Sequence, residues 1–325
     1  PGPVETIFVM DDRHDPSYPL VMDAIARHDE LGLADDVSAL LCGPPVQGLT
    51  GKLNAMIAGL AHAGNEVIVF ADSDIRPDRD GLRVLVETLM SSRQAGSAFT
   101  PVYSALPTHT PGDAGYALLL NGLYGSAAAA AARRRGGEMP FIMGQFMAFR
   151  RQAIKAIGGL ESARGQLVDD MYLGARIKEE GYTNMVCPHP VPVIQRGMSL
   201  GEFWGVYRRW IAFGRSGLPG MDFKLTSFLH GLVYWAGLGG AAMGAWLGLW
   251  HVAVMCALAP VAVAASITVL HGALGGAPLP PRHWAVALGL LLVAPVVFAS
   301  LLTNKQVSWR GRTYELSLDS RLSGE

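Results

Sequence analysis

The sequence predicts an α/β domain with a mostly parallel sheet, followed by a helical membrane domain. Strand-like and helix-like segments alternate between residues 5 and 71, which is the pattern of a parallel sheet covered by helices on both faces. The distribution of charge is the second observation. Only 16% of the 325 residues are charged, against about 25% in a typical soluble domain. The stretch 225–281 contains no Asp, Glu, Lys or Arg, which indicates membrane segments.

Five segments near the N-terminus give the alternation. Residues 5–10 (ETIFVM) are rich in β-formers, and residues 36–43 (DVSALLCG) form a second strand-like run. Helical spacing of apolar residues predicts helices over 18–31 and 50–64, the second ending at a glycine. The run 66–71 (EVIVFA) is continuously apolar, which is typical of a strand buried on both faces. Since the chain opens almost inside a strand and without Met, we expect that its natural N-terminus is missing.

The middle of the chain is less regular. Residues 115–135 are apolar and then strongly basic. They predict either a buried or surface helix, or an interfacial segment whose arginines at 133–135 lie near lipid headgroups. Residues 141–160 predict a strand, a short helix and a glycine pair. Residues 167–182 predict a helix that stops at Gly181.

We divide the chain at residues 200, 224 and 304. Residues 1–200 are the expected α/β domain, 201–224 an interfacial segment, 225–304 transmembrane helices and 305–325 a polar tail. Residues 284–303 lack charge over 20 positions, which is enough to span a bilayer. The stretch 226–272 fits two spans, or one span and a re-entrant helix. Three full spans would place the basic stretch 305–312 opposite the α/β domain, against the positive-inside rule, so one segment is expected not to cross.

Composition argues against several other classes of protein. The formal net charge of −1 gives no reason to expect a nucleic-acid partner. Cys42, Cys187 and Cys256 are far apart and odd in number, so they predict neither a disulfide framework nor a zinc site. This cysteine usage fits a reducing compartment.

An acidic cluster, FADSDIRPD at 70–78, follows the apolar strand. Ligands bind beyond the carboxyl ends of strands in open α/β sheets. The D-x-D spacing of Asp72 and Asp74 lets both carboxylates approach one cation, and Mg²⁺ or Mn²⁺ commonly binds one or two carboxylates together with substrate phosphates. The cluster therefore predicts either a metal and diphosphate site or a solvated turn. Asp78 is predicted to cap a helix beginning near Arg79.

Two further groups of residues combine charged side chains with a possible role in catalysis or phosphate binding. Asp169 and Asp170 fall in the first turn of the helix predicted over 167–182, where they act either as ordinary caps or as a general base. Residues 207–215 (YRRWIAFGR) lie just before the membrane segments. Their arginines either anchor the chain to anionic lipid or clamp a phosphate, and Trp210 offers a flat surface for stacking.

These motifs, in this order along nearly the whole chain, resemble a known family. An aspartate after a strand, GKLN, ADSD, GQFMAFRR with GGL, DDMYLG, RRW and three membrane segments are similar to family 2/21 type glycosyltransferases. The ceramide glucosyltransferase branch, including bacterial hopanoid-associated lipid glycosyltransferases, is the most similar. The resemblance implies a nucleotide-sugar-binding domain of the GT-A type anchored to a membrane. It also implies an N-terminal membrane helix and a first strand, which we expect to be missing here together with the natural N-terminus.

The resemblance assigns roles to residues at the donor site. Asp11 matches the first aspartate of the family, which binds the nucleotide base, with Asp12 as the alternative. Lys52 matches a lysine near the nucleotide. Asp72 matches the second aspartate and, with Asp74, would hold Mg²⁺ or Mn²⁺ and the diphosphate.

The remaining roles concern catalysis. Asp170 matches the third aspartate, the catalytic base, and Asp169 its acidic neighbour. Arg209 and Trp210 match the end of the Q/R-x-x-R-W motif of the family. The first position of that motif falls on Val206, which is a departure from the family pattern and bears on the diphosphate contacts.

The resemblance implies an inverting hexosyltransferase that moves one sugar from a UDP-sugar, glucose or a related hexose, to a hydroxyl of ceramide or a hopanoid-like lipid. The expected partners are the UDP-sugar, the lipid acceptor and the membrane, with the catalytic domain on the cytoplasmic side, as in a bacterial inner membrane. Two alternatives stay open: a processive polysaccharide synthase, and a catalytically degenerate, membrane-anchored binding protein.

Overall fold

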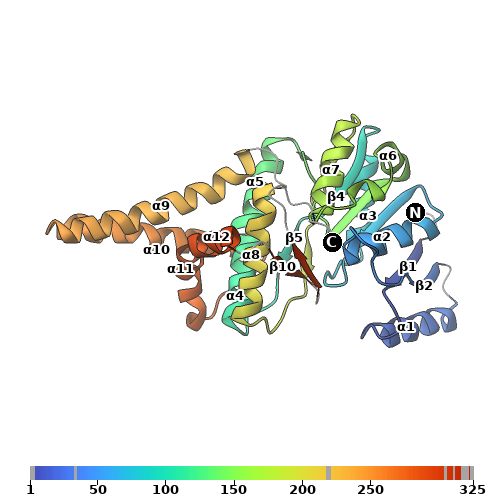
Figure 1. The fold of residues 1–325 in the computed structure, drawn as a ribbon, viewed down its shortest axis with the longest axis horizontal. Coiled ribbons are helices and arrows are strands. Elements are labelled where there is room, and N and C mark those ends of the chain that lie inside the picture. The colour runs from blue at the N-terminus through green and yellow to red at the C-terminus, as the bar shows by residue number, and fades with distance from the viewer. Residues whose placement is uncertain are drawn as a thin grey trace.

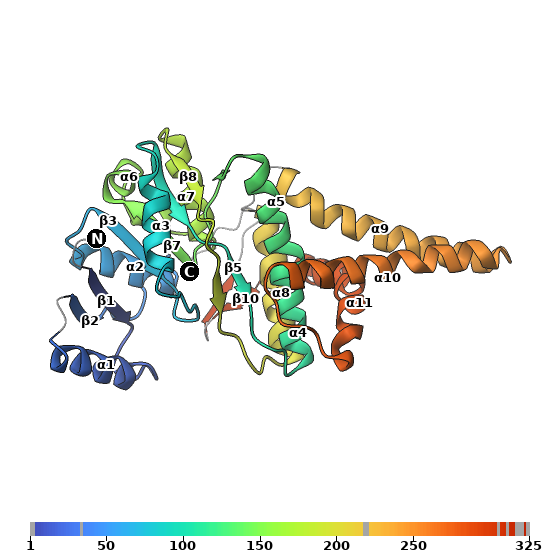
Figure 2. The ribbon, with the colours of Figure 1, turned by 180° about the vertical axis from the view of Figure 1, so that it is seen from behind.

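A computed structural model describes residues 4–32, 35–216, 221–303, 306–309, 312–315 and 322. An α/β domain occupies one end, and a long pair of helices projects from the other (Figure 1). The reverse view shows several helices lying between these two parts (Figure 2). This arrangement follows the expected order of α/β domain and helical domain.

A strand–helix–strand unit begins the chain. It consists of β1 (Glu5–Met10), α1 (Tyr18–Glu30) and β2 (Asp36–Leu41). The two strands pair in parallel over their whole length, from Glu5 opposite Asp36 to Met10 opposite Leu41. They form a two-stranded sheet of their own, at the end of the molecule away from the helical pair (Figure 1). The three elements predicted here are confirmed.

The main sheet has five strands in the order β3-β7-β4-β8-β6. Their bounds are β3 (Val67–Ala71), β4 (Ala95–Phe99), β6 (Glu138–Met139), β7 (Phe146–Arg150) and β8 (Thr183–Val186). Strand β7 runs antiparallel to both β3 and β4, β6 runs antiparallel to β8, and β4 and β8 are parallel. The prediction of a mostly parallel sheet is therefore wrong, and the sheet is mixed. An apolar run such as FMAFR shows that a strand is buried but carries no information about its direction.

Helices cover both faces of this sheet, as predicted. Alternate residues of β7 point to opposite faces: Phe146 and Ala148 pack with α3 (Gly81–Met90), whereas Met147 and Phe149 pack with α2 (Gly51–His62) and α7 (Asp169–Glu179). The remaining elements of this part are β5 (Val102–Ser104), paired in parallel with β9 (Val191–Val193), α6 (Arg151–Ala156) and a 3₁₀ turn (Leu160–Ala163).

The apolar and basic segment at 115–135 is a buried helix for most of its length. It runs through α4 (Pro111–Ala117), a π-helical stretch (Leu118–Gly125) and α5 (Ser126–Arg134), and residues 112–123 are buried. Gly122 allows helix α10 to pack closely against this segment, since a Cβ at Gly122 would lie 2.5 Å from the Ile267 side chain of α10. The buried alternative thus holds for the apolar half. The exposed arginines at 133–135 leave their headgroup contact a prediction.

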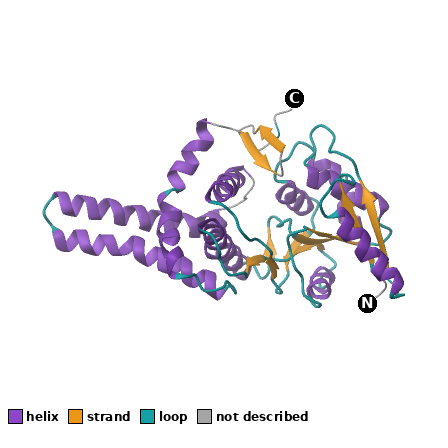
Figure 3. Cartoon of the chain, turned by 90° about the horizontal axis from the view of Figure 1, so that it is seen from below, coloured by secondary structure: helices purple, strands orange, loops and turns teal. Residues whose placement is uncertain are grey.

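The helical part comprises α8 (Leu200–Ser216), α9 (Met221–Trp246), α10 (Trp250–Ala273), a 3₁₀ turn (Pro281–His283), α11 (Trp284–Leu292) and α12 (Ala294–Thr303). Helices α9 and α10 form the projecting antiparallel pair (Figure 3). Among the described residues, α10 is long and apolar enough to cross a membrane, and the segment 281–300 would be a second crossing if its two halves, bent by 52°, count as one. The uninterrupted span predicted over 284–303 is therefore a bent pair, because Pro295 has no N–H to continue the helix.

Part of the predicted polar tail is folded. Strands β10 (Gln306–Trp309) and β11 (Arg312–Glu315) form an antiparallel hairpin (Figure 3). Tyr314 and Leu322 pack against a small cluster of Leu167, Val168 and Ala212, and the Leu322 N–H donates to the Gly165 carbonyl at 2.8 Å. The tail consequently contacts the segment that leads into α7.

Candidate active site

The ammonium group of Lys52 lies among three aspartates, Asp72, Asp169 and Asp170, where the main sheet meets α2 and α7. Lys52 Nζ lies 2.8 Å from Asp72 Oδ1 and also donates to the Gly144 carbonyl at 2.7 Å. Asp169 and Asp170 act on the same ammonium electrostatically. Three of the predicted site residues, Lys52, Asp72 and Asp170, are thus brought together with Asp169.

The first turn of α2 positions Lys52. Thr50 is the N-cap of this helix, and its hydroxyl accepts the Leu53 N–H at 3.1 Å, which satisfies one of the amide groups left free at a helix start. The same hydroxyl donates to Asp169 Oδ2 at 3.3 Å. Thr50 is fully buried, so it fixes the start of α2 against the start of α7.

The carboxylates of Asp169 and Asp170 are oriented by backbone N–H groups of α7. Asp169 Oδ1 accepts the Asp170 N–H at 2.8 Å, and Asp170 Oδ1 accepts the Met171 N–H at 2.7 Å. Asp170 also accepts the backbone N–H of Gly144. Asp169 is 4% exposed, whereas Asp170 is only partly buried. Of the two carboxylates, Asp170 is therefore the one that a substrate can reach.

Burial dominates the acid–base chemistry of this cluster. It raises the pKa of Asp169 to about 6 and raises the pKa of Asp170, although the nearby Lys52 ammonium opposes both shifts. Burial by itself would lower the pKa of Lys52, but Asp72, Asp169 and Asp170 together raise it. A carboxylate with a raised pKa accepts a proton more readily, which suits a general base.

A second group of predicted residues lies within electrostatic range of the Tyr116 hydroxyl on α4. Burial raises the Tyr116 pKa, Asp74 and Asp72 raise it further, and Arg209 lowers it. These charges must lie near the tyrosine to act on it, so Asp74 and Arg209 belong to the same neighbourhood as Asp72. Asp74 is exposed, and its carbonyl accepts the Ile194 N–H at 2.7 Å, which ties the D-x-D turn to the residues after β9.

Trp210 packs inside the helical part of the molecule. Its ring centroid is 5.6 Å from that of Tyr116 and 5.3 Å from that of Tyr124. Val206, one turn earlier on α8, also packs against the apolar core. Val206 and Trp210, the apolar residues of this motif, therefore pack α8 against its neighbours, including α4. This packing favours a positioning role for Trp210.

Asp11 lies at the carboxyl ends of β1 and β2, beside the first turn of α2. Its carbonyl accepts the Gly43 N–H at 2.9 Å, and the Cys42 thiol is 3.9 Å from its Oδ1. Asn54 of α2 donates to the Gly43 carbonyl at 3.2 Å. Asp12 instead lies in an exposed turn, where it accepts the His14 N–H at 2.6 Å. Of the two candidates, Asp11 is the one that faces α2.

Asp78 acts close to its predicted place. Helix α3 begins at Gly81 rather than near Arg79, and Asp78 Oδ1 accepts the Gly81 N–H at 2.8 Å. Asp78 also pairs with His189 at 2.9 Å. The third carboxylate of the acidic cluster is thus structural.

The donor set fits one divalent cation held by few protein ligands. Within the part of the chain that the structure describes, no three His, Cys, Asp or Glu side chains converge as a metal cage. The partly buried cluster nevertheless holds three carboxylates against one ammonium, and Asp74 adds another carboxylate nearby. An excess of carboxylate and a small number of protein ligands suit Mg²⁺ or Mn²⁺ completed by substrate phosphates.

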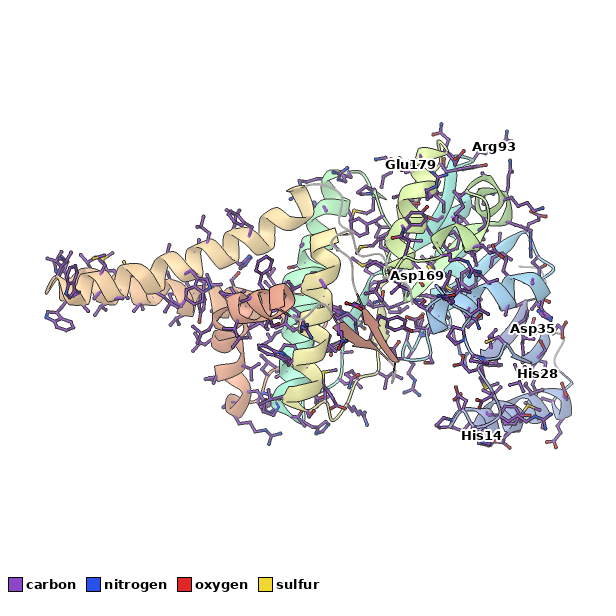
Figure 4. All side chains as sticks on the ribbon, viewed as in Figure 1. His14, His28, Asp35, Arg93, Asp169 and Glu179 are labelled. Atoms are coloured by element: carbon purple, nitrogen blue, oxygen red, sulfur yellow. The ribbon has the colours of Figure 1, made fainter. Side chains whose placement is uncertain are left out.

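Sequence reasoning missed three residues of this site. Thr50 carried a usable signal, because a threonine before a helical run is a common N-cap. Gly144 opens the GQFMAFRR motif, but the motif did not reveal its contact with Asp170 and Lys52. Tyr116 carried no signal, since its importance depends on contacts between segments far apart in the sequence. Figure 4 shows Asp169 near the side of the α/β domain that faces the helices, far from His14 and Asp35 of the N-terminal unit.

Residues 3–322 match the sequence model of the family described as Glycosyl transferase family 21. The chain belongs to glycosyltransferase family 21. A relative of this family 21 glycosyltransferase is ceramide glucosyltransferase 3 of Caenorhabditis elegans, 21% identical over 309 residues. The alignment covers 86% of this chain and 60% of the relative, so the chain spans about three fifths of the relative's length.

Two solved structures are similar to this family 21 glycosyltransferase. The mannosyltransferase PcManGT from Pyrobaculum calidifontis, in complex with GDP-Man and Mn²⁺, is 21% identical with a TM-score of 0.46, over 90% of this chain and 76% of that one. The glucosyl-3-phosphoglycerate synthase from Mycobacterium tuberculosis, bound to Mn²⁺, UDP and its product, is 19% identical with a TM-score of 0.36, over 67% and 81% of the respective chains.

Proposed function

We propose that this family 21 glycosyltransferase is a membrane-bound, inverting enzyme that transfers one hexose from a UDP-sugar to a lipid hydroxyl. The observation that carries the proposal is the partly buried cluster of Lys52, Asp72 and Asp170. It combines an oriented base with a charged site for a diphosphate, at the end of a strand where α/β folds bind ligands. The family and the ceramide glucosyltransferase relative support a glycolipid product.

Asp170 is the general base in this proposal. Its carboxylate takes the proton of the lipid hydroxyl while the hydroxyl oxygen forms a bond to the anomeric carbon. The bond from that carbon to the diphosphate oxygen breaks, and its electron pair leaves with UDP. Attack from the face opposite the leaving group inverts the configuration. The backbone N–H groups of Gly144 and Met171 hold Asp170 in place, which supplies orientation at low entropic cost.

The leaving diphosphate is proposed to lie between Asp72 and Arg209. Asp72 and Asp74 would hold Mg²⁺ or Mn²⁺, which supplies Lewis-acid stabilisation of the developing charge when bound. Arg209 offers a guanidinium in the same neighbourhood, and such donors act strongly at sites from which water is excluded. Lys52 holds the Asp72 carboxylate at 2.8 Å. Asp11, beside the first turn of α2, is proposed to bind the nucleotide base.

The helical part is proposed to hold the enzyme at a membrane, where the lipid acceptor is. The pair of α9 and α10 presents large exposed apolar side chains along its length and at its tip, where Trp246 is 81% and Trp250 67% exposed. Tryptophan is common at membrane–water interfaces, so the tip fits the far interface of a bilayer. Helix α8 and its arginines would then lie at the near interface, beside the active site, on the cytoplasmic side.

The direct test is incubation of membranes containing the protein with a panel of labelled UDP-hexoses and Mn²⁺ or Mg²⁺, followed by mass analysis of extracted lipids. The proposal predicts a lipid whose mass has increased by one hexose. A polymer would instead identify a processive synthase. No turnover with any donor, by protein that binds UDP, would identify a degenerate binding protein.

A further inference from the structure

Gln145 lies beside the carboxylate cluster on the same face of the sheet. It comes just before β7, and its carbonyl accepts the Asp72 N–H at 2.8 Å. In the antiparallel register of β3 and β7, Phe70 faces Met147 and Ala71 faces Phe146, so the next facing pair is Asp72 and Gln145. Side chains alternate along a strand, which puts this pair on the Met147 face, toward α2 and α7.

The neighbouring Gly144 shows how close Gln145 is to the reacting groups. A Cβ added to Gly144 would lie 2.7 Å from Asp170 Oδ2 and 2.8 Å from Lys52 Nζ. The backbone at Gly144, immediately before Gln145, is therefore in close contact with the Asp170 carboxylate and the Lys52 ammonium. Gln145 thus has Asp72 opposite it on the neighbouring strand, and the residue before it, Gly144, contacts Asp170.

The side-chain carbonyl of Gln145 is buried without a hydrogen bond from any residue that the structure describes. Buried amide groups almost always have a partner, because an unpaired polar atom loses the hydrogen bonds that water would give it. Such an exception beside a catalytic cluster points to a group that is paired only when ligand is bound. The two ends of an amide differ in polarity, and a sugar hydroxyl, which both donates and accepts, pairs with either end.

We infer that Gln145 binds a hydroxyl of the donor sugar and so helps to select which sugar is transferred. This inference rests on the proposed function, in which the diphosphate lies at Asp72 and the base is Asp170. The transferred sugar connects these two points, and Gln145 lies next to both. Its uncharged amide suits a neutral hydroxyl. The surrounding carboxylates suit a cation or a proton instead, and the ammonium suits a phosphate.

The test compares the full-length wild type with Gln145→Met, which keeps the length of the side chain and removes the amide. Binding of UDP-glucose and of UDP, with Mn²⁺, is measured for both proteins by calorimetry. We expect Gln145→Met to weaken UDP-glucose binding by about 3- to 10-fold, the value of one neutral hydrogen bond, and to leave UDP binding unchanged. Gln152→Met, on the exposed surface of α6, is the matched control and should change neither.

Thermal unfolding separates a binding role from a structural one. Because Gln145→Met removes a buried unpaired acceptor, the inference predicts an equal or higher Tm together with the weaker UDP-glucose binding. A lower Tm with equal losses of UDP and UDP-glucose binding would overturn it, since that result describes a structural residue. Unchanged binding of UDP-glucose would overturn it as well.

Deoxy analogues of UDP-glucose identify the hydroxyl. Removing the hydroxyl that Gln145 contacts should weaken binding to the wild type and cause no further loss in Gln145→Met; additive losses for every analogue would contradict the inference. The proposed function fails separately. If wild-type membranes transfer no hexose to lipid although the Gln145 effect on binding is present, the transferase proposal is wrong and the sugar contact stands.

Discussion

Gly144 is the residue on which the geometry of the active site depends most closely. It has no space for a side chain, since a Cβ would come within 2.8 Å of both Asp170 Oδ2 and Lys52 Nζ. Gly144→Ala must push the base or the ammonium away from its place. A displacement of about 1 Å at a reacting group costs about 100-fold in rate. We expect that loss in transfer assays on membranes. Gly205→Ala, on α8 with open space around its Cα, should retain activity, and full activity in Gly144→Ala would contradict the described site.

Asp169 gives a pH-dependent prediction at the same scale. Burial raises its pKa to about 6, above the usual value near 3.9. Between these values the folded protein binds more protons than the unfolded chain, so this group makes stability fall as pH rises from about 4 to about 6. Asp169→Asn removes the effect. The stability of the variant relative to the wild type should be more favourable at pH 8 than at pH 4 by up to about 3 kcal/mol.

Denaturant unfolding in chelator at the two pH values measures this difference. A variant destabilised equally at both pH values would mean that Asp169 contributes through hydrogen bonds alone. Asp169 accepts the Thr50 hydroxyl at Oδ2 and the Asp170 N–H at Oδ1. The amide of Asp169→Asn has one acceptor oxygen and keeps one of these two hydrogen bonds, a loss that is the same at both pH values. The substitution therefore tests charge with little change of shape.

At the scale of elements, the break between α11 and α12 is supported by aromatic donors. Pro295 has no N–H, so the Leu291 carbonyl lacks its usual partner four residues on, and Trp235 Nε1 donates to it at 3.2 Å. Tyr207 of α8 donates to the Leu290 carbonyl at 3.1 Å, and Tyr234 donates to the Leu288 carbonyl at 2.6 Å. The bent pair is thereby tied to α8, the helix that carries Arg209.

Trp235→Phe should leave the Leu291 carbonyl unpaired and cost about 1–3 kcal/mol of stability. The measurement is thermal unfolding in detergent micelles. Trp246→Phe, at the exposed tip of the helical pair, is the control and should cost little. Equal Tm values for the two variants would show that the indole hydrogen bond does not support the break.

The same scale shows what sequence reasoning can reach. The elements from β1 to β3, and α7 with its two aspartates, were predictable because each has its own periodicity and its own turn residues. The direction of β7 was not, since FMAFR is buried on both faces and reads alike in either direction. The bend at Pro295 and the contact of Tyr314 with Leu167 depend on partners distant in sequence. Of the site, the charged residues were predictable from the family resemblance. Gly144 and Gln145 fall in the GQFMAFRR motif, but their roles depend on contacts that the sequence does not show, and Tyr116 had no signal.

At the scale of the whole molecule, the contact between the tail and the α/β domain bears on membrane topology. Tyr314 and Leu322 pack beside Leu167 and Val168, so the β10–β11 hairpin and the α/β domain lie on one side. Helix α9 is less apolar than α10, but it packs along α10 and exposes large apolar side chains such as Phe228 and Leu232. We propose that α9 and α10 cross the bilayer and return, and that the bent pair of α11 and α12 enters and leaves by the same face. This arrangement removes the conflict with the positive-inside rule that three full spans would create.

Labelling with a membrane-impermeant maleimide tests this topology. Single cysteines at Arg93 on the α/β domain and at Glu315 on the hairpin should react from the same side of the membrane. A cysteine at Trp246 should react from the opposite side, because the tip of the helical pair is expected there. Opposite labelling of positions 93 and 315 would mean that the bent pair crosses completely.

The central claim is that Asp170 is the base of a glycosyl transfer, and one comparison tests it most directly. Wild type and Asp170→Asn are assayed in parallel for transfer of hexose from UDP-hexose to lipid and for binding of UDP with Mn²⁺. The account predicts that Asp170→Asn abolishes transfer and leaves nucleotide binding largely intact. Transfer at the wild-type rate, or loss of both transfer and binding, would contradict it, because Asp170 would then be dispensable or structural.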